Sequence, residues 1–230
     1  MNQKKLDQKK PLALVVFLEN VGHIQGVRLP QWAMDMVDFV TEEYAKALLR
    51  LLGAYRRYAN VVVLEDASAN GPALVNALTN TSRTHQVDVL LLVHGHQGCL
   101  VGYRGKQMVG AETFEPLVAA YRQDPTLLDL RMVYGLNCYG ASLANTWMAL
   151  GAQAVNGAVG VNWFPEPSLS VFLYNWLKGR PYSQAVRKSN LRANQFWRNL
   201  LKTNAPGEIH PWIESSRQVV YGVRDVTIAS

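Results

Sequence analysis

Two short apolar segments of this chain end at residues that could form a nucleophile and its base. Residues 89–93 (Val-Leu-Leu-Leu-Val) lead into His94, and residues 132–136 (Met-Val-Tyr-Gly-Leu) lead, after one asparagine, into Cys138. A cysteine attacks as the thiolate, and only a few per cent of a free thiol is ionised at neutral pH. A histidine within reach can accept that proton and later protonate a leaving amine. The two residue types together predict a cysteine–histidine dyad that hydrolyses peptide bonds.

Such a dyad also needs hydrogen-bond donors for the negative oxygen of the tetrahedral intermediate. Loss of one such donor typically costs about 10²–10³ in rate. Gly95 follows His94 and offers an N–H with no side chain beside it, and Cys138 offers its own amide. We therefore expect the amides of Gly95 and Cys138 to form an oxyanion hole.

His94 and Cys138 can meet only if the segments that precede them are neighbouring strands. Apolar segments of strand length alternate along the chain with amphipathic segments of helical spacing. The predicted strands cover residues 12–18, 61–64, 87–93, 131–136 and 154–163, with a late edge strand over 219–223, and the predicted helices cover residues 30–52, 71–82, 112–122, 140–150, 169–178 and 182–202. This alternation predicts an α/β fold with a mostly parallel sheet, which binds ligands at the carboxyl edge of its strands.

The composition is that of a globular protein with a large core. Of 230 residues, 49% are hydrophobic and 17% are charged. No segment approaches the roughly 20 apolar residues of a membrane helix, so we expect no membrane association. We interpret residues 1–11 as a basic tail before a single domain over residues 12–230. The apolar segment after the tail lacks a cleavage site, and only two cysteines occur, so we expect a reducing, cytoplasmic location.

Two further residues near His94 could take part in the chemistry. His96 could serve as the base, but it lies beyond the predicted strand end, where its direction is less fixed. Cys99 could be a second reactive thiol, although free cysteines are commonly buried packing residues. The two histidines and two cysteines could also bind zinc, but no compact Cys-x-x-Cys pair is present. We expect His94 to be the base, and neither a metal ion nor a cofactor.

The sequence around His94 and Cys138 resembles the catalytic motifs of the caspase-like cysteine peptidase clan, whose fold is shared by caspases, gingipains, legumain and separase. Residues 93–102 (Val-His-Gly-His-Gln-Gly-Cys-Leu-Val-Gly) are similar to the histidine loop of caspases, and residues 136–140 (Leu-Asn-Cys-Tyr-Gly) to their Gln-Ala-Cys-Arg-Gly box. The separation of 44 residues (138 − 94) is close to the roughly 50 that this pairing shows. The resemblance covers about Leu12 to Lys178 and is nearest to bacterial-type caspase-like domains found beside tetratricopeptide repeats.

This resemblance implies a caspase-like three-layer αβα sandwich with a mostly parallel central sheet. It also implies that Cys138 is the nucleophile and His94 the base, with the Gly95 and Cys138 amides as the oxyanion hole. The protein would then be a cysteine endopeptidase acting on protein or peptide substrates. The alternative is a catalytically silent or latent scaffold with the same fold, or an enzyme controlled by a regulatory partner or an activating domain.

The chain differs from caspases at the positions that select aspartate. Leu136 stands where caspases have glutamine, and Asn162 and Trp163 lie where they have Ser-Trp-Arg. The first strand ends in Glu19 and Asn20, where caspases have an arginine. We expect these five residues to line the substrate site, and we expect no aspartate specificity, because the arginines that would pair with a carboxylate are missing.

Cleavage after arginine or lysine would instead need a buried acid in the pocket. Glu19 is the best-placed candidate, and Glu166 and Asp66 are further ones. For each of the three we favour a surface carboxylate, because Asp and Glu side chains are mostly exposed.

Other features of the chain suggest different functions. Its net charge is +6, and the last long helix carries basic residues with two aromatic ones interleaved: Lys188, Arg192, Arg198 and Lys202, with Phe196 and Trp197. Such a stripe can bind phosphates, but a basic stripe can equally form the solvated face of an amphipathic helix. We favour the second interpretation. We expect no nucleic-acid partner. No glycine-rich dinucleotide motif follows the first predicted strand, so we expect no nucleotide either.

Overall fold

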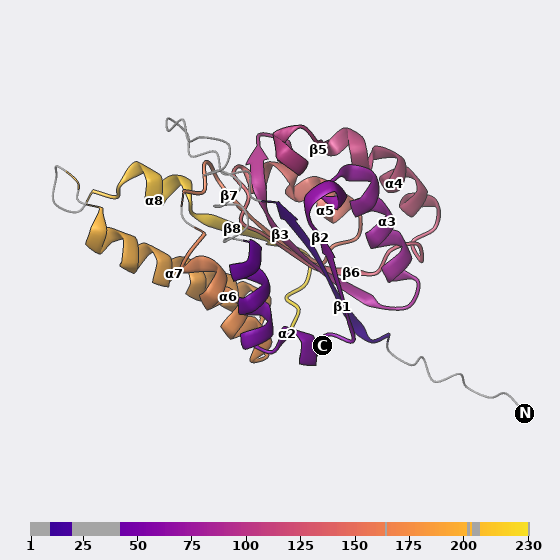
Figure 1. The fold of residues 1–230 in the computed structure, drawn as a ribbon, viewed down its shortest axis with the longest axis horizontal. Helices are drawn as coiled ribbons and strands as arrows, with labels where there is room; N and C mark the ends of the chain where they lie inside the picture. Colours follow the sequence, from indigo (N-terminus) through magenta and orange to yellow (C-terminus); the bar gives the residue numbers. More distant parts are fainter. Residues whose placement is uncertain (1–9, 20–41, 164, 202, 204–207, 230) are drawn as a thin grey trace, which may run out of the picture.

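The computed structural model describes residues 10–19, 42–163, 165–201, 203 and 208–229. Their strands form one mixed sheet (Figure 1). Its six-strand path runs β2 (Asn60–Leu64), β1 (Leu12–Glu19), β3 (Gln86–His96), β6 (Leu130–Gly135), β7 (Ala154–Ala158) and β8 (Gln218–Gly222). All neighbouring pairs on this path are parallel except β7 with β8, which is antiparallel. The predicted mostly parallel sheet is confirmed.

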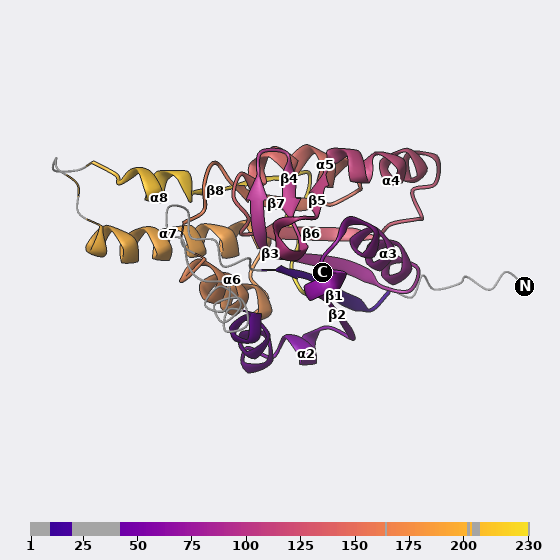
Figure 2. The same ribbon diagram turned by 45° about the horizontal axis from the view of Figure 1, so that its top comes forward.

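Helices cover both faces of the sheet, which gives three layers (Figure 2). On one face lie α3 (Gly71–Ser82), α4 (Ala111–Gln123) and α5 (Ala144–Ala149), whose apolar residues share one core cluster with the sheet. On the other face a second cluster joins the helical residues 42–51, α2 (Ala54–Arg57), α6 (Ser168–Leu177) and α7 (Tyr182–Leu200). The short helix α8 (Pro211–Ser215) lies beside α7 at the β8 side of the sheet (Figure 1).

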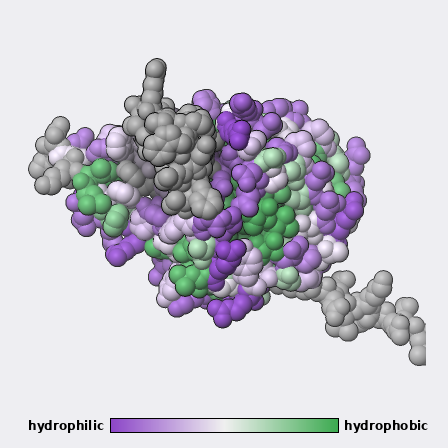
Figure 3. Space-filling model, viewed as in Figure 1, coloured by the Kyte–Doolittle hydropathy of each residue, from purple (hydrophilic) through white to green (hydrophobic). Residues whose placement is uncertain are grey.

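The central strands are apolar on both sides because each side packs against a helical layer. In β1, Leu14, Val16 and Leu18 belong to the cluster under α6 and α7. Val15 and Phe17 belong to the cluster under α3 and α4. The edge strand β2 has half-buried valines at 61–63, and hydrophobic residues gather on that part of the surface (Figure 3).

Helix α3 begins where its sequence indicates. The side chain of Asn70 accepts a hydrogen bond from the N–H of Ala73 at 2.9 Å, and Pro72 occupies the first turn, where its missing N–H has no cost. Of the predicted helix over 30–52, residues 42–52 are described, and residues 42–51 are helical. The remainder of that helix, Asn20 and residues 1–9 of the predicted tail lie outside the described residues.

Two predicted strand ends were wrong. Strand β3 continues through His94 to His96, because the backbone beyond Val93 pairs antiparallel with β4 (Cys99–Val101), which in turn pairs with β5 (Met108–Gly110). Strand β7 ends at Ala158 rather than at residue 163, because the following backbone leaves the sheet and bonds to the end of α8. The Gly160 N–H donates to the carbonyl of Ser215 at 2.9 Å.

A buried ion pair ties the middle of the sheet to the α2 and α6 layer. Arg131 on β6 and Asp88 on β3 are 2% and 0% exposed, and the Arg131 Nε lies 3.0 Å from an Asp88 carboxylate oxygen. The Tyr58 hydroxyl donates to the same carboxylate at 2.8 Å and accepts from the Trp176 indole at 2.8 Å. A buried carboxylate needs such partners, since desolvation alone would disfavour its charge.

No helix among the described residues is long and apolar enough to cross a membrane.

Candidate active site

His94 and Cys138 follow two neighbouring strands at the carboxyl edge of the sheet. The ladder between β3 and β6 ends with Leu91 opposite Gly135, and the Leu136 N–H still donates to the Leu91 carbonyl at 3.0 Å. Each of the two candidates lies three residues beyond that last pair, and both are half-buried. The register therefore places the two side-chain types at the edge where parallel α/β sheets bind ligands.

The backbone of Gly95 is in direct contact with the backbone of Cys138. A methyl group built on Gly95 would lie 2.2 Å from the Cys138 carbonyl oxygen and 3.0 Å from the Cys138 nitrogen. No side chain fits there, so glycine is required by the approach of the two loops. The two amides predicted for the oxyanion hole thus lie next to each other.

The Cys138 sulfur is surrounded by backbone N–H groups. The Asn162 N–H donates to Sγ at 3.3 Å, and the amides of Gly95 and of Cys138 itself also act on the sulfur. Burial raises the pKa of the Cys138 thiol, and these three donors lower it, but the effect of burial is larger. Because the net shift disfavours the thiolate, a proton acceptor is needed to populate it near neutral pH.

The cysteine loop is fixed against the segment after β7. Tyr139 has a left-handed backbone (φ 54°), and its N–H donates to the Gly160 carbonyl at 2.7 Å. A methyl group on Gly157 would lie 2.1 Å from the Ala141 nitrogen, so the turn after Cys138 packs directly on the β7 backbone. A non-glycine residue with a left-handed backbone, such as Tyr139, persists only where its surroundings hold it, and such residues cluster at active sites.

Glu19 is a buried carboxylate at the same edge. It is 6% exposed, it lies opposite Val93 in the β1–β3 ladder, and its Oε1 accepts the Arg104 N–H at 2.8 Å. The alternative that Glu19 is a surface carboxylate was wrong, because η2 (Tyr103–Gly105) covers it.

The two other acids considered for the pocket have different environments. Glu166 is half-buried and accepts hydrogen bonds from the Tyr44 hydroxyl at 2.9 Å and the Ser170 hydroxyl at 2.7 Å, so it ties α6 to the helix over 42–51. Asp66 is exposed. Glu19 is therefore the most buried of the three carboxylates.

The other predicted substrate-site residues are divided between the site and the core. Asn162 contacts Cys138 through its amide, and its side-chain Nδ2 donates to the Leu136 carbonyl at 2.6 Å. Leu136 is 6% exposed and belongs to the core cluster on the α6 and α7 side. Trp163 stacks on Trp212 of α8 with ring centroids 4.6 Å apart. The sequence pattern did not identify Trp212 as a neighbour of Trp163. The one signal in that segment was Pro211, which occupies the first turn of α8.

The two alternative reactive residues, His96 and Cys99, are peripheral. Both lie in the hairpin that the end of β3 forms with β4, here called the His94 hairpin. His96 is exposed, and its ring centroid lies 6.4 Å from that of Tyr139. Cys99 is half-buried opposite His96 and Gly110, and burial raises the pKa of its thiol. Among the described residues, no group of three or more His, Cys, Asp or Glu side chains could hold a metal ion.

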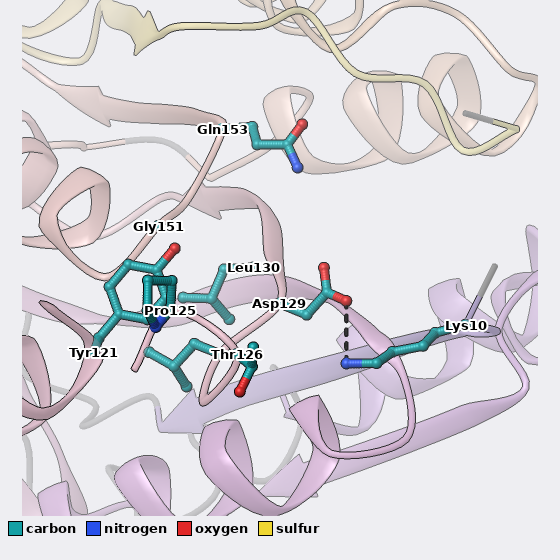
Figure 4. Close-up of a pocket in the computed structure, with 9 residues that line it drawn as sticks. Lys10, Tyr121, Pro125, Thr126, Asp129, Leu130, Gly151 and Gln153 are labelled. Carbon is teal, nitrogen blue, oxygen red and sulfur yellow. Dashed lines mark ion pairs between the residues drawn. The ribbon is translucent and has the colours of Figure 1, made fainter. Parts of the chain in front are cut away.

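A cavity of about 350 Å³ lies at the opposite end of the sheet (Figure 4). Lys10, which precedes β1, and Asp129, which precedes β6, form an ion pair of 3.3 Å on its wall. Because these residues lie at the amino ends of the strands, this cavity is separate from the site around Cys138.

The sequence matches no known family model and no curated protein sequence. Among solved structures, the chain is similar to the Arg-specific cysteine proteinase gingipain R (RgpB), with a TM-score of 0.57 and 11% identity over 93% of this chain and 46% of that one. It is also similar to the complex of the Porphyromonas gingivalis RgpB pro- and mature domains, with a TM-score of 0.55 and 11% identity over 93% of this chain and 47% of that one.

At this identity the likeness concerns the fold alone. The mixed α/β sheet with helices on both faces is the caspase-like fold of gingipain, which confirms the predicted fold class. The chain spans about half the length of the structures it matches.

Proposed function

We propose that this protein is a cysteine endopeptidase in which Cys138 is the nucleophile and His94 the base. The observation that carries the proposal is the convergence of three backbone N–H groups, from Gly95, Cys138 and Asn162, on the Cys138 sulfur. Donors that surround a thiol at the carboxyl edge of the sheet are suited to stabilise a thiolate and then an oxyanion.

The chemistry follows from these positions. His94 accepts the Cys138 proton, and the thiolate forms a C–S bond with the scissile carbonyl carbon while the carbonyl π electrons move to oxygen. The Gly95 and Cys138 amides donate to that oxygen. Collapse of the intermediate breaks the C–N bond, and the imidazolium protonates the leaving amine. Water then attacks the thioester with His94 as base, which releases the acid product and restores the thiol.

The substrate we propose has arginine or lysine before the cleaved bond. Glu19 supports this, because it is a buried acid at the same sheet edge and lies opposite Val93, the neighbour of His94. One of the solved structures with a similar fold, gingipain R, is an Arg-specific proteinase, which is consistent with an acidic pocket. The chain offers no corresponding arginine at the positions where caspases bind aspartate.

The first test is labelling of the protein with peptidyl acyloxymethyl ketones, read by peptide-resolved mass spectrometry. The reactive end would carry Arg, Lys, Asp, Asn, Leu or Ala. We expect adducts on Cys138 that form about 10²–10⁴-fold more slowly in His94→Ala, at a residual rate that can still be measured, and that persist in Cys99→Ala. No adduct from any probe on folded protein would contradict an active peptidase. It would favour a catalytically silent scaffold or a latent enzyme that needs an activating partner.

The second test concerns Glu19. Glu19→Gln keeps an oxygen that can accept the Arg104 N–H but removes the charge. Because a hydrogen bond to a charged group contributes about 1.5–3 kcal/mol, we expect labelling by the Arg and Lys probes to slow by about tenfold or more, with the Leu probe unchanged. Glu166→Gln is the matched control and should change neither. Equal effects on all probes would remove Glu19 from the substrate pocket.

A further inference from the structure

The hydroxyl of Ser142 joins the loop that carries the base to the loop that carries the nucleophile. Its Oγ accepts the Gly98 N–H at 2.8 Å, and it donates to the Tyr139 carbonyl at 2.6 Å. Gly98 lies in the turn between β3 and β4, and Tyr139 is the residue after Cys138. Ser142 itself lies in η3 (Gly140–Leu143), where its N–H also donates to the Tyr139 carbonyl at 2.8 Å.

The His94 hairpin extends beyond the strands that pair with β3 in the main sheet. The ladder to β6 ends at Leu91 and the ladder to β1 ends at Val93, so from His94 onward the described pairing of β3 is with β4 alone. Gly98 has a left-handed backbone (φ +78°), and a methyl group built on it would meet no described atom within 4 Å. The tip of the hairpin is therefore open, and the hydrogen bond from the Gly98 N–H to Ser142 joins it to the cysteine loop.

We propose that Ser142 is a positioning residue, which sets the place of the His94 hairpin relative to Cys138 by bridging Gly98 and Tyr139. The inference rests on the proposed peptidase function. Ser142 acts through the two backbones, because its hydroxyl bonds to the Gly98 N–H and the Tyr139 carbonyl. A misplacement of about 1 Å in a catalytic pair can cost about 10²-fold in rate, whereas two exposed hydrogen bonds add little to global stability.

The test compares Ser142→Thr with Ser142→Val, which have nearly the same shape but differ in the hydroxyl. Ser142→Ala removes the hydroxyl without adding any atoms. Ser183→Ala is the matched control, because the exposed Ser183 hydroxyl likewise bridges two segments, at 2.7 Å to Asp225. Two quantities are measured for each folded variant: the native-state exchange rate of the Gly98 amide, and the rate of Cys138 labelling by the best ketone probe.

We expect Ser142→Ala and Ser142→Val to accelerate Gly98 exchange by about tenfold or more and to slow Cys138 labelling by about tenfold to a hundredfold. Ser142→Thr should stay within about threefold of the wild type, and Ser183→Ala should change neither quantity. In a His94→Ala background, Ser142→Ala should have no further effect on labelling, because a residue that acts through His94 cannot act without it. A merely structural role would slow labelling equally in both backgrounds.

Three results would overturn the proposal. Unchanged Gly98 exchange in Ser142→Val would show that the bridge does not hold the hairpin. Faster exchange with unchanged labelling would show that the bridge does not position the base. Labelling of the wild type that does not depend on His94 would overturn the dyad itself, and it is recognised without any Ser142 variant.

Discussion

Gly95→Ala is the most direct test of the geometry at the sheet edge. The added methyl group would lie 2.2 Å from the Cys138 carbonyl oxygen, and ordinary contacts to a Cβ begin at about 3.4 Å. One of the two loops must therefore move by about 1.2 Å. A misplacement of about 1 Å can cost 10²-fold in rate, and loss of one oxyanion donor costs about 10²–10³. We expect Cys138 labelling by the best ketone probe to fall by about 10²–10³.

The assay must separate this loss from general destabilisation. Overpacking of this size typically costs about 1–3 kcal/mol in unfolding free energy, which urea titration measures. Gly179→Ala is the control: Gly179 has a left-handed backbone (φ +84°) after α6, and a methyl group there meets nothing within 4 Å. We expect it to lower stability by about 1–2 kcal/mol and to leave labelling unchanged. A folded Gly95→Ala protein that labels within about threefold of wild type would refute the contact between the loops.

Three further outcomes follow from the structure. Arg131→Met leaves the buried Asp88 carboxylate without its cation, so we expect urea unfolding to show a loss of about 3–5 kcal/mol; a change below 1 kcal/mol would contradict a structural ion pair. Burial raises the pKa of the Cys138 thiol, so in His94→Ala the rate of its alkylation by iodoacetamide should still be rising at pH 9. The same shift affects the unfolding free energy, because the thiol ionises at lower pH in the unfolded chain than in the folded protein. Its stabilising contribution is present below about pH 8.5 and falls as the pH rises through the folded pKa. Gly157→Ala would push the cysteine loop off β7, and we expect Cys138 labelling to fall at least tenfold; normal labelling would mean that this packing does not position the nucleophile.

The sequence alone determined the layers of the fold and the sheet edge at which His94 and Cys138 lie. Buried parallel strands are continuous apolar segments and their covering helices are amphipathic, so the alternation of the two predicted the sheet. Because parallel strands share one carboxyl edge, the residues that follow segments 89–93 and 132–136 were expected at that edge, and the pairing of β3 with β6 makes them neighbours. His94, Gly95 and Cys138 were identified in this way, and the β3–β6 register places them there.

Only the tertiary structure decided what surrounds them. The Asn162 amide on the Cys138 sulfur, the η2 backbone over Glu19 and the Ser142 bridge are contacts between segments that lie far apart along the chain. Most of these donors are backbone N–H groups, which every residue except proline possesses, so residue type gives no signal for them. The extension of β3 beyond the sheet has the same cause: backbone pairing with β4 determines it, and the polar side chains of the hairpin do not.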